Sequence, residues 1–206
     1  MSSTKDKKIK AIEVAAERCR NCDLYRHATQ VVFGSGNTSA KIMIVGEQPG
    51  NAEDLAGVPF VGPAGGVLKH CLEEAGIRED EVYLTNAVKH FKHHISGGGK
   101  RRLHDRPNAA EVKACHPWLE KELAVVRPKI IVALGLTAAR SVLGRTLVIS
   151  KERGEILDEL EGGARVIISW HPSAILRSIS REQSAKMRQE LVKDLKLAKK
   201  KTDYSR

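Results

Sequence analysis

The sequence of 206 residues is poor in aromatic side chains and has no long apolar run. Its 2 Trp, 3 Tyr and 3 Phe amount to 4% of the chain, which argues against a broad aromatic platform for stacking bases. The longest apolar runs, such as residues 129–135, have the length of strands, so a membrane-spanning helix is excluded. The first ten residues are charged and lack an apolar segment, so we expect no secretory signal.

Cysteine is also scarce, with four in the chain. Without a secretory signal we expect a reducing, cytoplasmic environment, in which thiols bind metal or pack in cores. Cys71 shares a helical face with apolar neighbours and is interpreted as a core thiol. Cys19 and Cys22 form a CxxC pair, and Cys115 follows much later. Their spacing leaves a redox dithiol, a zinc site and an iron–sulfur cluster open.

Positive charge is in excess, with 35 Lys and Arg against 25 Asp and Glu, a net charge of +10. The excess gathers at 5–10, 100–106 and 177–201, which favours a polyanionic partner through counterion release. The clusters near the two ends can also be explained as solubilising. The internal cluster follows three glycines, and we interpret it as a mobile loop that contacts phosphate.

Strand and helix patterns alternate along the chain. Short, nearly continuous apolar runs separated by helices predict an α/β fold, a three-layer αβα arrangement with a central four-stranded parallel sheet. We expect one domain over 1–206, flexible at about 1–8 and 200–206, and a small hairpin within 148–160. The expected strands are 41–46, 82–88, 129–134 and 165–170, and the expected helices are about 63–75, 108–126, 137–143 and 181–199.

Unusual polar residues follow three of these strands. The segment 46–50 (GEQPG) follows the first, Asn86 ends the second, and His171 follows the fourth. Ligands of open α/β sheets bind beyond the carboxyl ends of the strands, so these residues predict one common cleft.

His104 lies in the basic segment 97–107 (GGGKRRLHDRP). A loop histidine is often a solvent-exposed bystander, and Glu47 in its Gly/Pro turn can simply cap a turn. The cations next to His104, however, disfavour an imidazolium, and a neutral imidazole can attack an electrophilic carbon.

Six motifs run in order along most of the chain, and together they resemble the uracil-DNA glycosylase superfamily. The similarity is to its iron–sulfur family-4-like branch, and within it to the UdgX type, which becomes covalently joined to uracil-containing DNA. Gln48, where family-4 enzymes carry Ala, and the inserted KRRLH segment at 100–104 both point to the UdgX type. The motifs are CxxC at 19–22, GEQPG at 46–50, PFVGPAG at 59–65, YLTNAVK at 83–89, KRRLH at 100–104 and HPS at 171–173.

The resemblance implies a [4Fe–4S] cluster and a set of site residues. The cluster ligands would be Cys19, Cys22, His90 and Cys115, with His90 at a position where family-4 enzymes carry cysteine.

By the same resemblance, Phe60 would stack on a flipped uracil, Asn86 would read its edge, and His171 would donate to uracil O2. Glu47 would stabilise the sugar cation and orient His104, whose imidazole would attack C1′. The remaining implied residues are Gly46 in the uracil pocket, Gln48 as a positioning group, and Lys100, Arg101, Arg102, Ser173 and Arg177 on the DNA.

The sequence therefore predicts a monomeric, nucleoid-associated DNA-repair enzyme without membrane contact. It would excise uracil, most readily from single-stranded DNA because unstacking costs least there. It would then remain joined to the abasic sugar through His104. The alternatives are a conventional hydrolytic family-4 enzyme and a non-catalytic DNA-binding iron–sulfur protein.

Overall fold

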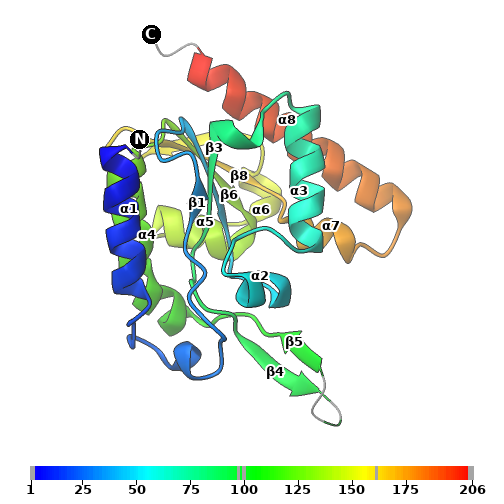
Figure 1. Cartoon of the computed structure of the whole chain (residues 1–206). Coiled ribbons are helices and arrows are strands. Elements are labelled where there is room, and N and C mark those ends of the chain that lie inside the picture. The colour runs from blue at the N-terminus through cyan, green and yellow to red at the C-terminus, as the bar shows by residue number, and fades with distance from the viewer. Residues whose placement is uncertain (1–2, 97, 99–100, 161, 204–206) are drawn as a thin grey trace.

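The computed structural model describes residues 3–96, 98, 101–160 and 162–203. These residues form a six-stranded sheet with helices packed against it (Figure 1). The strand order is β1-β3-β2-β6-β8-β7, and the four central strands are parallel, as predicted. The bounds are β1 (Ser35–Gly36), β2 (Ile42–Gly46), β3 (Val82–Asn86), β6 (Ile130–Leu134), β7 (Ile156–Glu159) and β8 (Arg165–Ser169).

Helices cover both faces of the sheet and confirm the three-layer arrangement (Figure 1). One face carries α1 (Thr4–Ala16), α4 (Ala109–Val126) and α5 (Gly135–Leu143), and the other carries α3 (Pro63–Glu74), α7 (Pro172–Leu176) and α8 (Arg181–Asp203). The short α2 (Asn51–Ala56) and two 3₁₀ turns (Asp23–Arg26 and Glu79–Glu81) lie in connections. No helix among the described residues has the length and apolarity needed to cross a bilayer.

The edges of the sheet differ from the prediction. β1 and β7 are antiparallel additions, and each is too short to stand out as a strand in the sequence. The hairpin expected within 148–160 is wrong, because these residues form α6 (Ile149–Glu152) and then β7, which pairs with β8.

Helices reach nearly to both ends of the described chain, and the expected flexibility at about 1–8 and 200–206 stays a prediction. The hydroxyl of Ser3 accepts a hydrogen bond from the Asp6 amide, and the Asp6 carboxylate accepts one from the Ser3 amide, so a capping box starts α1. Lys5 donates to the Val126 carbonyl at 2.8 Å, and Ile9 is buried. At the other end α8 continues to Asp203; residues 1–2 and 204–206 lie outside the description.

The basic segment forms a projecting hairpin, which corrects the prediction of a mobile loop (Figure 1). Strands β4 (His93–Ser96) and β5 (Arg101–His104) pair antiparallel, with His93 opposite His104. Both strands carry polar residues on both faces, so they lack the alternation that reveals a strand. Lys100, the predicted phosphate contact, lies outside the described residues.

A buried ion pair joins the end of β3 to α4. The ammonium of Lys89 lies 2.5 Å from a carboxylate oxygen of Glu122, and both side chains are almost inaccessible to solvent, at 1% and 0%. Lys89 also donates to Thr85 and to the Asn86 carbonyl, and Glu122 accepts from Tyr83. Burial and the adjacent carboxylate raise the pKa of Tyr83, so its phenol remains a neutral donor.

Removing one partner of this pair should be costly, because a buried charge without a counter-charge destabilises the fold. We expect Lys89→Met to lower the free energy of unfolding by about 3–5 kcal/mol, and Lys89→Met/Glu122→Leu to recover much of that loss. Urea titration of the whole protein measures both. Lys10→Met, which breaks the exposed Lys10–Glu13 pair, is the matched control and should change little. Equal losses in Lys89→Met and the control would contradict the expectation.

Candidate active site

The loops after β2, β3 and β8 meet the tip of β5 around one pocket of about 330 Å³. Seven of the residues that the sequence singled out line this pocket, although they lie up to 129 positions apart in the chain (residues 48 and 177). These are Gln48, Phe60, Asn86, His104, His171, Ser173 and Arg177. The convergence predicted from the carboxyl ends of the parallel strands is therefore present in the structure.

Phe60 and Asn86 both line the pocket, and both approach Gly46 closely. A Cβ at Gly46 would lie 2.3 Å from Asn86 Oδ1 and 2.8 Å from Phe60 Cζ, so glycine allows this arrangement. Phe60 has a left-handed backbone with φ of 58°, and a Cβ at Gly65 would lie 1.8 Å from the Phe60 carbonyl oxygen. Such a strained residue held by its surroundings is typical of a binding site. An aromatic ring and a donor–acceptor amide in one pocket suit a flat heterocycle.

His171 has a defined tautomer. The backbone N–H of Ser173 donates to its Nδ1 at 3.1 Å, so Nδ1 is the acceptor and the proton of the neutral ring sits on Nε2. Burial, with Arg177 and His104 nearby, lowers the pKa of His171 to about 4. At neutral pH this side chain is therefore an uncharged hydrogen-bond donor.

His104 lies beside a carboxylate. Its Nε2 is 3.5 Å from Glu47 Oε1, and its side chain is 41% exposed at the pocket. Partial burial lowers the pKa of His104, which outweighs the opposing effect of Glu47. The other oxygen of Glu47 accepts from the Thr137 hydroxyl at 2.5 Å and lies 3.8 Å from Arg106. The site thus contains a neutral imidazole next to a carboxylate that the Thr137 hydroxyl holds in place.

Two side chains fasten the hairpin that carries His104. Gln48 donates to the carbonyls of Lys92 and Asp105 at 3.2 and 2.9 Å, so it bridges the residues that flank β4 and β5. Arg102 donates to the fully buried Asp54 at 2.6 Å and to Asn51 at 2.8 Å. Arg102, predicted to contact DNA, therefore anchors the hairpin, whereas Arg101 is exposed.

Sequence reasoning missed two carboxylates and one hydroxyl group at the site, those of Glu53, Asp54 and Thr137. Glu53 is buried and accepts from the amides of Gly50 and Gly62, which fixes the loop that carries Phe60. The spacing of Gly50 and Glu53 as a capping box was the available signal. Asp54 and Thr137 carried none, because their partners are distant in the sequence.

The four residues predicted as metal ligands line a second, closed cavity between the end of α1, the segment after β3, and α4. They are Cys19, Cys22, His90 and Cys115. The Trp118 indole donates to Cys19 Sγ and the Lys89 amide to Cys115 Sγ, both at 3.2 Å. Cys71 is buried elsewhere, between α3 and its neighbours, as predicted for a core thiol.

Three thiols and one imidazole around one cavity are donors that both zinc and iron–sulfur clusters take. Among the described residues, no three Cys, His, Asp or Glu side chains are arranged as ligands of a single metal ion. Burial also raises the pKa of Cys22 and Cys115, unlike the lowered pKa of a redox CxxC.

Comparison with known proteins places these features in a family. The model described as "Uracil DNA glycosylase superfamily" matches residues 33–196. A type-4 uracil-DNA glycosylase of Thermotoga maritima is 37% identical over 198 residues, which are 95% of each chain. The type-4 uracil-DNA glycosylase of Archaeoglobus fulgidus is 38% identical over 165 residues, 77% of this chain and 78% of the relative.

A solved structure supports the fold alone. The crystal structure of Pedobacter heparinus SMUG2 superposes with a TM-score of 0.56 at 15% identity, over 80% of this chain and 77% of that one. Its likeness confirms the predicted α/β architecture independently of close sequence similarity.

Because folded His171 is neutral, the free energy of unfolding should decrease in acid. A histidine in the unfolded chain takes a proton near pH 6.5, whereas folded His171 takes it near pH 4, so stability falls as the pH drops below 6.5. We expect the free energy of unfolding to fall between pH 7 and pH 5 by about 2 kcal/mol more in the wild type than in His171→Gln. Urea titrations at the two pH values measure this difference, and identical pH dependence in both proteins would contradict it.

Proposed function

The chain belongs to the uracil DNA glycosylase superfamily, and on that premise we propose that it excises uracil from DNA. The observation that carries the proposal is that one pocket brings together the Phe60 ring, the Asn86 amide and the neutral His171, whose Nε2 carries the ring proton. Its named type-4 relatives support the same activity. Removal of uracil is a DNA-repair reaction.

The reaction starts with a nucleotide out of the stack, because C1′ and the base edge are inaccessible within a duplex. Phe60 would stack on the extruded uracil, and the Asn86 amide would pair with its polar edge. As the N-glycosidic bond breaks, its electron pair goes to the base, and His171 would donate to O2 where negative charge develops. One such donor typically contributes a factor of about 10²–10³ to the rate.

The sugar left behind is an oxocarbenium-like cation, and Glu47 would stabilise it. Two groups can then capture C1′. In hydrolysis a water attacks and Glu47 takes its proton, which leaves a free abasic site. The comparisons favour this outcome, because the most similar relatives reported above are named as type-4 glycosylases.

The position of His104 favours a second outcome, which is our finer proposal. A lone pair of the neutral imidazole would form a bond to C1′ in place of water, and the resulting imidazolium would lose its other ring proton to solvent. Imidazole on C1′ is a poor leaving group, so the protein would stay joined to the DNA after one turnover. The ring lines the pocket beside Glu47, and Gln48 and Arg102 hold its strand in place.

For the DNA itself we propose contacts along the pocket rim. Arg177 donates to Ser173 Oγ at 3.1 Å and lines the pocket, which supports our proposal that it fills the space that an extruded base leaves. Arg101 on the hairpin would meet the backbone. Arg102 would act on DNA only indirectly, through the position of the hairpin.

A denaturing gel with uracil-containing single-stranded DNA tests both levels of the proposal. We expect release of uracil together with a retarded band that survives SDS and heat, and we expect His104→Ala to abolish the band. Release without a band would leave the hydrolytic enzyme, and an undiminished band in His104→Ala would place the nucleophile elsewhere. His94→Ala, which changes an exposed histidine on β4, is the matched control and should retain the wild-type result. A wild type that releases no uracil would refute the function.

We also propose that the second cavity holds a [4Fe–4S] cluster on Cys19, Cys22, His90 and Cys115. The role we assign is structural, since such a cluster cross-links the segments that supply its ligands. It would fasten the N-terminal segment and α4 to residues just beyond Asn86.

Iron content and visible absorbance test the cluster. Thiolate-bound iron is expected to absorb broadly at roughly 400 nm. We expect iron in the wild type, retention in His90→Cys, and loss in His90→Ala. Cys71→Ala is the matched control, because Cys71 lies in a different core and should be dispensable for iron. Colourless, iron-free wild type with full activity, or iron loss in Cys71→Ala alone, would refute the assignment.

A further inference from the structure

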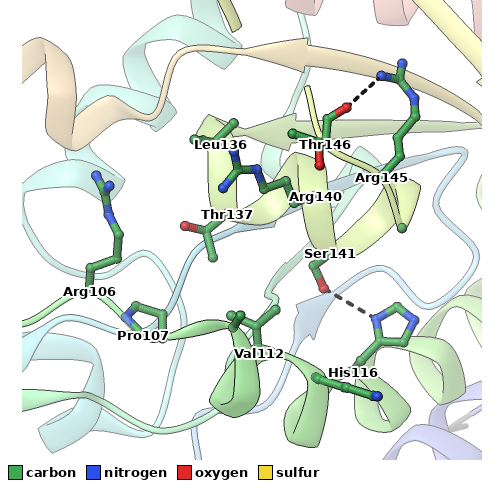
Figure 2. A pocket seen from close by; sticks show the side chains of 13 residues that line it. Arg106, Pro107, Val112, His116, Leu136, Thr137, Arg140, Ser141, Arg145 and Thr146 are labelled. Carbon is green, nitrogen blue, oxygen red and sulfur yellow. Dashed lines mark hydrogen bonds between the residues drawn. The ribbon is translucent and has the colours of Figure 1, made fainter. Parts of the chain in front are cut away.

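A pocket of about 680 Å³ between α4 and α5 has no part in the chemistry described so far (Figure 2). Its apolar floor includes Pro107, Val112 and Leu136, and Figure 2 shows three arginines around them, Arg106 at one end, Arg145 at the other and Arg140 between. The hydrogen bond between His116 and Ser141 closes one side at 3.4 Å.

The lining is cationic and contains no carboxylate. Four basic residues line it, namely Arg106, Lys113, Arg140 and Arg145. Arg145 is paired with Glu152 at 2.6 Å, and Arg106 lies 3.8 Å from Glu47. Lys113 and Arg140 are exposed, and neither forms an ion pair with any residue in the described part of the chain. These two charges remain available to an external anion.

A hydrogen bond links this pocket to the carboxylate beside His104, although no described residue lines both pockets. Thr137 lines this pocket and donates to Glu47, the carboxylate beside His104. The chain also leads directly from one pocket to the other, because His104 lines the first and Arg106, two residues later, lines the second. An extended ligand that passes the catalytic pocket on this side of Glu47 would reach Lys113 and Arg140.

We propose that this pocket, which we term the α4–α5 pocket, binds the phosphodiester backbone of the DNA strand next to the extruded nucleotide. The inference rests on the proposed function and extends it to the flanking strand. Exposed cations suit a long polyanion as ligand. Each cation that contacts a phosphate releases a counterion from the DNA, and many such weak contacts add up to the affinity of the protein for DNA. The apolar floor formed by Pro107, Val112 and Leu136 would lie against the deoxyribose.

The test compares two double variants that remove the same charge. Lys113→Gln/Arg140→Gln alters the α4–α5 pocket, and Lys193→Gln/Lys196→Gln alters exposed lysines of α8 on the opposite face of the sheet. Binding of thymine-containing single-stranded DNA is measured over a range of salt concentrations, so that no excision takes place. Each lost phosphate contact lowers the slope of log K against log salt by about 0.7. We expect the first variant to lose about 1.4 in slope, roughly 25-fold in affinity at 0.1 M salt, and the control to retain the wild-type slope.

Shortened oligonucleotides locate the contact. Removing nucleotides from one end of the thymine-containing strand should weaken binding by the wild type and leave binding by the pocket variant unaffected, since that variant has already lost the contact. Equal slopes in the pocket variant and the α8 control would overturn the proposal. In that case, thermal stabilisation by inorganic phosphate is compared between the wild type and the pocket variant. If the variant alone loses this stabilisation, the pocket binds a free anion and not the DNA strand. Uracil release is measured separately, so failure of excision and failure of strand binding are distinct results.

Discussion

The buried contact between Lys89 and Glu122 lies between the two candidate centres of this protein. Lys89 lies between Asn86, which lines the candidate active-site pocket, and His90, which lines the second cavity. Its ammonium bonds the Asn86 carbonyl while its own amide bonds Cys115 Sγ on α4. A buried pair of this kind contributes little net stability compared with apolar packing, whereas loss of one partner is costly. Through its bonds to Asn86 and Cys115, Lys89 connects the residue that we propose reads the base to the cavity that we assign to the cluster.

Under the proposed function, the outcome of the reaction would depend on the hairpin β4–β5. A sugar cation is captured by the nearest nucleophile, so the position of the His104 ring would set the choice between water and His104. That position rests on contacts remote from the ring, since Gln48 joins the two ends of the hairpin and the fully buried Asp54 holds Arg102. An exposed pair would contribute little to such positioning, whereas a charge-assisted bond to a buried carboxylate is strong and directional.

The central sheet could be predicted from the sequence because each parallel strand is buried on both faces and is therefore apolar throughout. The carboxyl-end rule then predicted the cleft around Asn86 and His171. The hairpin, helix α1 and the edge strands were missed, because their stability comes from partners far away in the chain. Arg102 and Asp54, 48 positions apart, illustrate this: basic composition indicated a mobile phosphate-binding loop, and a distant buried carboxylate makes it an ordered arm.

Two histidines of opposite role face the same pocket, and their surroundings explain the division. Burial and Arg177 keep both rings uncharged at neutral pH, so neither repels the developing cation. The Ser173 amide commits His171 Nδ1 to accepting, which leaves Nε2–H available for the donor role that we propose toward the departing base. His104 Nε2 instead lies 3.5 Å from the Glu47 carboxylate, and a neutral ring whose proton lies toward that carboxylate keeps the lone pair of its other nitrogen. In the proposed covalent reaction that lone pair would attack C1′, so the different hydrogen-bond partners of the two rings would give them different roles.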